Sequence, residues 1–281
     1  MGSYSEQALR SRINARIFTR HWQPDVPARG TVVLVHGLFE HSGRYLDVAT
    51  HLMQEGYAVW AFDHYGHGQS DGPRGYIEYD DQYVDDLDQI IALATEELGA
   101  KPALLGHSMG GAIASLYAVR HCERICGLAL SAPALRTYAS PMKVLVGRLA
   151  CRFAPKATFP SGLDGLPATH NPEWEEWKRN DPLKHNRLTL RLARFIVDAG
   201  AEARAKAGKV SVPVLILLAG QDAYVDNRGA REFFERLPAH CRELHEYPNF
   251  FHELLKEQGC EGVWETLDGW LRRVFQREPA A

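Results

Sequence analysis

The stretch "LLGHSMGGAIA" (Leu104–Ala114) places one serine between glycines two positions before it and two positions after it. The leucines before the serine end a predicted strand, and "AIASLYAV" (Ala112–Val119) predicts a helix after it. A strand, a sharp turn and a helix around G-x-S-x-G are typical of a nucleophile elbow, which exposes the serine hydroxyl at a helix N-terminus. Glycines permit the close backbone approach and the strained dihedral angles of such a turn. Ser108 is therefore the candidate nucleophile, and an ordinary glycine-rich loop is the alternative interpretation of the pattern by itself.

Short apolar runs alternate with helical patterns on both sides of this stretch. Continuous apolar runs are typical of parallel strands that are covered by helices on both faces. We predict strands at residues 31–37, 57–62, 102–106, 127–134 and 212–220, and an edge strand at 241–247. Helical patterns at 44–56 and 83–99 lie between these runs. The sequence thus predicts an α/β fold with a mostly parallel, doubly wound sheet.

One region interrupts the alternation of strands and helices. No buried strand is predicted between residues 136 and 186, which we interpret as a helical cap inserted between core segments 1–135 and 187–281. Its "PMKVLVGRLACRFAP" (residues 141–155) has an apolar face formed by Leu145, Val146, Leu149 and Phe153. Packing of this face on its own domain is the favoured interpretation. Transient contact with a membrane or lipid surface is the alternative.

Composition excludes several classes of function. The 281 residues carry a formal charge of −3 without a basic cluster, which argues against nucleic acid as a partner. No run has the length and apolar character of a transmembrane helix, and we see no signal peptide. Five scattered cysteines are typical of reduced thiols, so we expect a cytoplasmic protein. Association with a membrane is the alternative, if the cap makes transient contact with lipid. His64 and His67 lack a third ligand at suitable spacing, and we predict neither a metal nor a cofactor.

A serine nucleophile needs a base and an acid, which follow it along the chain in this type of fold. Asp222 follows the strand predicted at 212–220, at the sheet edge where active groups of open α/β sheets lie. Asp226 is the second choice for the acid, with a solvated surface role favoured for it. The candidate base is His252, because a loop after the last strand can return over Ser108. His107 adjoins the serine and points differently from a base, so binding or elbow packing suits it better.

An oxyanion hole needs two backbone donors near the nucleophile. The N–H of Met109 stands at the helix N-terminus next to Ser108. The second donor belongs to the loop after an early strand, which indicates the N–H of Leu38, with Phe39 as the alternative.

Several motifs together resemble one known family. They are "HGLFEHSGRY" (36–45), "DHYGHGQSDG" (63–72), "GHSMGG" (106–111), "NDPL" (180–183), "GQD" (220–222) and "FHELLKE" (251–257). Their order is similar to that of the monoacylglycerol lipase and lysophospholipase branch of the α/β-hydrolases, from about residue 12 to 275. The resemblance implies a triad of Ser108, Asp222 and His252, an oxyanion hole at Leu38 and Met109, and a cap that lines an acyl tunnel. It also implies that Glu40 and Arg44 lie near the alcohol end of the ester.

Two positions depart from the pattern of the family. Lys178 stands where relatives often carry a tyrosine, and Leu255 stands where animal lipases carry a second histidine. Because both positions are linked to holding glycerol, the resemblance supports ester chemistry more firmly than a preference for glycerol. Lys178 is a candidate contact for an anionic head group, and a solvated cap lysine is the favoured alternative.

The leading hypothesis is a serine carboxylic-ester hydrolase that cleaves monoacylglycerols or related lipid esters through an acyl-enzyme. A lysophospholipase, a thioesterase or another acyl hydrolase of the same fold is the alternative, because a fold does not fix a function. A binding protein that kept the fold and lost turnover is a hypothesis of a different class.

Overall fold

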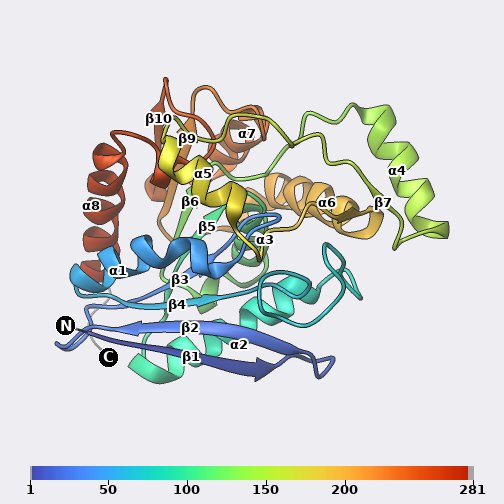
Figure 1. Ribbon diagram of the computed structural model, residues 1–281. Helices are drawn as coiled ribbons and strands as arrows, with labels where there is room; N and C mark the ends of the chain where they lie inside the picture. The colour runs from blue at the N-terminus through green and yellow to red at the C-terminus, as the bar shows by residue number, and fades with distance from the viewer. Residues whose placement is uncertain (1, 278–281) are drawn as a thin grey trace.

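The computed structural model describes residues 2–277 (Figure 1). Met1 and residues 278–281, at the outer ends of the predicted core segments 1–135 and 187–281, lie outside the described residues. Eight strands form one sheet in the order β1-β2-β4-β3-β5-β6-β9-β10. Their bounds are β1 Ser3–Arg10, β2 Arg16–Gln23, β3 Thr31–Val35, β4 Ala58–Phe62, β5 Ala103–His107, β6 Gly127–Ser131, β9 Val214–Ala219 and β10 Arg242–Tyr247.

The sheet is parallel from β4 to β10, and in the described chain its antiparallel pairings are β1 with β2 and β2 with β4. The predicted α/β fold with a mostly parallel sheet is therefore confirmed. The α-helices of the core are α1 Leu46–Gln54, α2 Gln82–Leu98, α3 Met109–His121, α6 Leu190–Lys206, α7 Arg228–Arg236 and α8 Glu261–Arg277. Short 3₁₀ helices, labelled η, are η1 Ser42–Tyr45, η2 Cys122–Arg124, η3 Ala207–Lys209, η4 Ala239–Cys241 and η5 Leu254–Lys256.

Helices cover both faces of the sheet, and alternate strand residues enter two separate cores. Val33 and Val35 of β3 pack with residues of α2, α3, α6 and α7. Val32 and Leu34 of the same strand pack with residues of α1 and α8 on the opposite face (Figure 1). All of these strand side chains are buried. Burial on both faces explains why the central strands have continuous apolar runs in the sequence.

The antiparallel hairpin of β1 and β2 was not predicted from the sequence. Most residues of β1 are exposed, and its sequence "SYSEQALR" has no apolar run. β1 pairs only with β2 in the described structure, so it forms an edge of the sheet that needs little apolar surface. β1 therefore lacks the continuous apolar run by which the buried parallel strands were predicted.

Two helices and a short ladder lie between β6 and α6. They are α4 Pro141–Phe153, β7 Thr158–Phe159, α5 Pro172–Asn180 and β8 Leu188–Thr189, with β7 and β8 paired antiparallel. Ser140 caps the N-terminus of α4, and Asn171 caps that of α5 through the N–H groups of Glu173 and Trp174. The boundaries 136 and 186 of the cap stay a prediction.

The apolar face of α4 does not pack on its own domain, so the favoured interpretation was wrong. Leu145, Val146, Leu149 and Phe153 are between 58% and 79% exposed. Figure 1 shows α4 at the periphery of the molecule, beside one end of α6. No helix within residues 2–277 is both long enough and apolar enough to cross a bilayer.

Candidate active site

Ser108 lies directly after β5 in a strained conformation. Its φ of 51° and ψ of −120° are unusual for a residue with a side chain. A Cβ atom at Gly110 would clash with the carbonyl of Val35, and one at Gly106 would clash with the carbonyl of Gly110. The N–H of Ser108 donates to the carbonyl of Ser131 on β6 at 3.1 Å. These contacts hold the serine at the sharp turn between β5 and α3.

Asp222 and His252 meet at the carboxyl edge of the sheet. Asp222 follows β9 and His252 follows β10, and these two strands are parallel neighbours. The His252 Nδ1–H donates to Asp222 Oδ2 at 2.7 Å. The other carboxylate oxygen accepts the N–H groups of Tyr224 at 2.8 Å and Val225 at 3.0 Å. Both oxygens of the carboxylate thus accept hydrogen bonds, which fixes its orientation.

The pairing shifts the pKa of both groups. Burial alone would lower the pKa of His252, but the charge of Asp222 and its hydrogen bond outweigh burial and hold that pKa above the usual 6.5. Burial alone would raise the pKa of Asp222, but the charge and hydrogen bond of His252 hold it below 3.8. Asp222 is therefore ionised at neutral pH, and its charge favours a protonated imidazole at His252.

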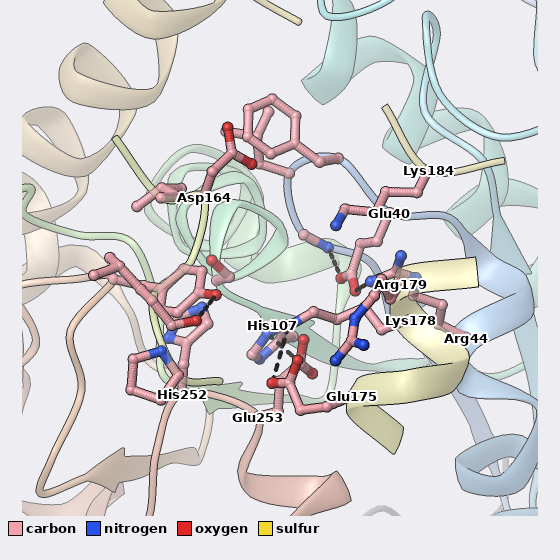
Figure 2. A pocket seen from close by; sticks show the side chains of 18 of the residues that line it. Glu40, Arg44, His107, Asp164, Glu175, Lys178, Arg179, Lys184, His252 and Glu253 are labelled. Carbon is pink, nitrogen blue, oxygen red and sulfur yellow. Dashed lines mark hydrogen bonds and ion pairs between the residues drawn. The ribbon is translucent and has the colours of Figure 1, made fainter. Parts of the chain in front are cut away.

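Ser108 lies where two cavities of opposite character meet. A cavity of about 450 Å³ is lined by Ser108, His252 and many charged side chains (Figure 2). A second cavity of about 550 Å³ is lined by Ser108, Met109 and mainly apolar residues of α4, α6 and the loops between them. The first is called the polar cavity below, and the second is called the apolar cavity. An amphiphilic molecule bound across Ser108 could place its two ends in these two environments.

The loop after β3 lies against Ser108. Leu38 lines both cavities, and a Cβ atom at Gly37 would stand 3.2 Å from the Cβ of Ser108. Phe39, the alternative donor, has φ 68°, which marks a tight turn at this point. The loop that carries the predicted donor Leu38 is thus within contact distance of Ser108.

Glu40 and Arg44 both line the polar cavity and are buried. Glu40 accepts the hydroxyl of Tyr45 at 2.7 Å and the N–H of Gly37, so its carboxylate also supports the loop after β3. Arg44 donates from Nε and Nη2 to Asp181 of the cap at 2.9 and 2.8 Å. Burial alone would raise the pKa of Asp181, but the hydrogen bonds and charge of Arg44 hold it below its usual value. Arg44 therefore joins the polar cavity to the segment that follows α5.

His107 packs beside His252 and does not contact Asp222 in its place. Its ring centroid is 4.8 Å from that of His252, and its Nδ1–H donates to the carbonyl of Ser131 at 3.1 Å. Its Nε2 is 3.8 Å from the carboxylate of Glu253, a further residue of the polar cavity. Burial lowers the pKa of His107, with the charge of Glu253 acting against that shift.

Lys178 faces the polar cavity, and the interpretation of a solvated lysine was wrong. Its side chain is only 12% exposed, and its Nζ lies 3.3 Å from Glu175. Lys184 and Arg179 line the same cavity, and neither forms an ion pair with a described residue. In the view of Figure 2 these three cations lie on the opposite side of the cavity from His252.

Asp226 does not contact His252. Its buried carboxylate pairs with Arg228 at 2.7 Å and with Arg136 at 3.1 Å, so the predicted surface role was wrong. His64 and His67 are fully buried beside other rings. Across residues 2–277, no three side chains of His, Cys, Asp or Glu are grouped so that they could hold a metal ion.

Three residues of the site were not predicted from the sequence. Asp181, which binds Arg44, is part of the "NDPL" motif, so the motif was a usable signal. Glu253 adjoins His252 in the sequence, and Tyr224 lies two residues after Asp222. Nothing in the local pattern indicates that the side chains of Glu253 and Tyr224 turn toward the cavity.

The sequence pattern of the family described as serine aminopeptidase, S33, matches residues 26–259. The chain belongs to this family. This chain is 30% identical to a monoacylglycerol lipase of Mycolicibacterium smegmatis, over 95% of this chain and 96% of that relative. It is also 30% identical to the monoglyceride lipase of Homo sapiens, over 94% of this chain and 88% of that protein.

The solved structures agree with these sequence comparisons. The crystal structure of Paleococcus ferrophilus monoacylglycerol lipase matches the structure of this chain with a TM-score of 0.84 and 32% sequence identity. The match covers 92% of this chain and 99% of that chain. The predicted resemblance to the monoacylglycerol lipase branch and the predicted α/β-hydrolase fold are therefore confirmed. The protein is a serine hydrolase.

Proposed function

We propose that this protein hydrolyses monoacylglycerols or closely related lipid esters through an acyl-enzyme on Ser108. The observation that carries the proposal is the position of Ser108 between an apolar and a polar cavity. An acyl chain fits the apolar cavity, and the alcohol of the ester fits the polar one. The names of the relatives from Mycolicibacterium smegmatis and Homo sapiens support this class of substrate.

In the proposed mechanism, Ser108 Oγ attacks the ester carbonyl while His252 takes the hydroxyl proton. Asp222 stabilises the resulting imidazolium through the 2.7 Å hydrogen bond. The N–H groups of Leu38 and Met109 stabilise the oxyanion of the tetrahedral intermediate. When the intermediate collapses, the bond between the carbonyl carbon and the alcohol oxygen breaks. His252 gives its proton to that oxygen, and the alcohol leaves. Water then attacks the acyl-enzyme, with His252 again as the base, and releases the fatty acid.

Within the polar cavity, we propose that Glu40 and Arg44 hold the hydroxyl groups of the leaving alcohol. Glu40 supplies acceptor oxygens and Arg44 supplies N–H donors, and both side chains are fixed by neighbours. We propose that His107 borders the same alcohol from the side of the base. Its ring lines the polar cavity beside His252.

The test is release of oleate from 1-monooleoylglycerol by the wild-type protein and by Ser108→Ala. We expect the variant to lose about 10⁶-fold in kcat, as in the triad template. A fluorophosphonate probe should label the wild type and leave the variant unlabelled. Oleate release that persists at the wild-type rate in Ser108→Ala would contradict the assignment of the nucleophile.

Lysophospholipids are a second candidate substrate class, favoured by the cations of the polar cavity. Lys178, Lys184, Arg44 and Arg179 all line this cavity. Burial and the charges of Lys178 and Arg44 lower the pKa of Lys184, with the charges of Asp164 and Glu175 acting against that shift. A phosphate group would relieve this crowding, since it would place negative charge between Lys178 and Lys184.

Hydrolysis of 1-oleoyl-lysophosphatidylcholine and 1-monooleoylglycerol should be compared in Lys178→Gln/Lys184→Gln. If the lysines hold a phosphate, the double variant raises KM for the lysophospholipid about tenfold or more and leaves KM for the glyceride nearly unchanged. Lys206→Gln is the matched control, because Lys206 is an exposed lysine that pairs with Glu202 on α6. An equal change for both substrates would exclude a phosphate site at these lysines.

We also propose that α4 contacts a lipid surface during catalysis. Its exposed Met142, Leu145, Leu149 and Phe153 form an apolar stripe at helical spacing. Lys143, Arg148 and Arg152 of the same helix add positive charge, which anionic lipids attract. The cytoplasmic location stays a prediction.

Co-sedimentation with vesicles of phosphatidylcholine and phosphatidylglycerol tests this contact. Replacement of Leu145, Leu149 and Phe153 by serine should leave most of the protein in the supernatant, whereas the wild type pellets. Leu46→Ser, which removes a leucine of similar exposure from α1, is the control. Equal pelleting of the triple variant and the wild type would rule out the contact.

A further inference from the structure

Tyr224 touches the acid, the base and the cap at the same time. Its N–H donates to Asp222 Oδ1 at 2.8 Å. Its ring stacks on the imidazole of His252, with centroids 4.7 Å apart and planes only 7° from parallel. Its hydroxyl donates to the carbonyl of Leu166 in the cap at 2.9 Å. Among the described residues, no other makes these three contacts together.

The imidazole needs such a neighbour because its hydrogen bond to Asp222 fixes only one edge of the ring. That bond, at Nδ1, leaves the ring free to tilt about the line between the two bonded atoms. A flat aromatic surface packed parallel to the ring opposes this tilt. His107 also contacts the imidazole, but its plane is inclined by 53° and so cannot supply that surface.

Tyr224 also forms part of the wall between the two cavities. It lines the polar cavity and the apolar cavity, as do Ser108 and Leu166. Burial raises the pKa of its phenol far above neutrality, so the hydroxyl keeps its proton and remains a donor to Leu166. The position of the cap at Leu166 is thus linked to the position of the ring over His252.

We infer that Tyr224 is a positioning residue that holds the His252 imidazole in its catalytic orientation and makes this orientation depend on the cap at Leu166. The inference rests on the proposed triad. A tilt that moves Nε2 away from the serine hydroxyl slows proton transfer, and small misplacements of this kind cost up to about 10²-fold in rate. The ring and the hydroxyl have separate roles, which separate variants can remove.

The experiment compares Tyr224→Leu, Tyr224→Met and Tyr224→Phe with the wild type and with Ser108→Ala. Each is assayed on p-nitrophenyl acetate, which is too short to fill either cavity, and on 1-monooleoylglycerol. The two variants without a ring should lose at least tenfold in kcat on both esters, with KM for the short ester within twofold of wild type. Tyr224→Phe keeps the stacked ring but lacks the bond to Leu166, so we expect a smaller loss in kcat of about threefold or more on both esters.

A role as cavity wall alone predicts a different result. It would raise KM for 1-monooleoylglycerol and leave kcat for p-nitrophenyl acetate unchanged in every variant, which would overturn the inference. Circular dichroism melting identifies variants that do not fold. If neither variant without a ring folds, Tyr224→Phe decides by itself, since wild-type kcat on both esters would refute the link to the cap. A wild type with no activity beyond that of Ser108→Ala would instead refute the proposed function.

Discussion

His252 shows at the scale of one residue how a structural environment sets a working pH. In the proposed mechanism the imidazole must be neutral to accept the proton of Ser108, because only its neutral form is a base. Burial and Asp222 act on its pKa in opposite directions, and Asp222 prevails. If His252 is the base, its raised pKa means that protonation inactivates the enzyme at a higher pH than it would with an exposed histidine.

We therefore predict the shape of the pH profile for a soluble short-chain ester. Activity falls as the pH decreases through the pKa of His252, so the acid limb of kcat/KM should have its midpoint above 6.5. Asp222→Asn should lose about 10⁴-fold in kcat, because the amide favours the wrong tautomer of the imidazole. A wild-type midpoint below 6 would show that Asp222 does not control the ionisation of His252.

At the scale of elements, α4 and α5 are attached to the core in different ways. The segment around α5 is held at both ends, by Glu257 against Thr169 and by Arg44 against Asp181. The ion pair of α4 joins Arg148 to Asp198, and both side chains are nearly half exposed. A buried pair and an exposed pair therefore join these two helices, both between β6 and α6, to the rest of the structure.

This contrast predicts different stabilities for two equivalent substitutions. Asp181→Asn leaves the buried guanidinium of Arg44 with weaker pairing and should cost about 2 kcal/mol, which lowers Tm by several degrees. Asp198→Asn removes an exposed pair worth at most about 1 kcal/mol and should change Tm little. Thermal melts of the two variants at pH 7 make the comparison. Equal values of Tm would show that Arg44 and Asp181 do not anchor the cap.

Elements also show how far the sequence predicts the fold. The central strands were predictable because burial on both faces leaves a continuous apolar run, as in β3 and β9. β1 was not predictable in this way because most of its residues are exposed. The direction in which the apolar side of α4 faces could not be predicted either, since a helix with an apolar stripe can turn it to a core or to solvent.

At the scale of the whole molecule, the position of the site could be predicted from the topology. Parallel strands bring their carboxyl ends to one edge, and this edge is where Asp222 and His252 meet. The bond between Arg44 and Asp181 joins residues 137 positions apart. Such contacts, like the stacking of Tyr224 on His252, depend on how the cap packs on the core, which no local pattern encodes.

The meeting of two unlike cavities at Ser108 has a consequence for the order of events in one turnover. In the proposed mechanism the alcohol leaves the polar cavity while the acyl chain is still covalently held in the apolar one. The vacated space can then admit another alcohol in place of water, so the enzyme should also act as an acyltransferase.

With p-nitrophenyl oleate in concentrated glycerol, release of p-nitrophenol should exceed release of oleate. The difference should appear as monooleoylglycerol. Equal release of the two products would mean that water alone reaches the acyl-enzyme. An excess of p-nitrophenol would mean that the polar cavity selects the group that accepts the acyl chain as well as the alcohol that leaves, so that the same residues govern both synthesis and breakdown of the ester.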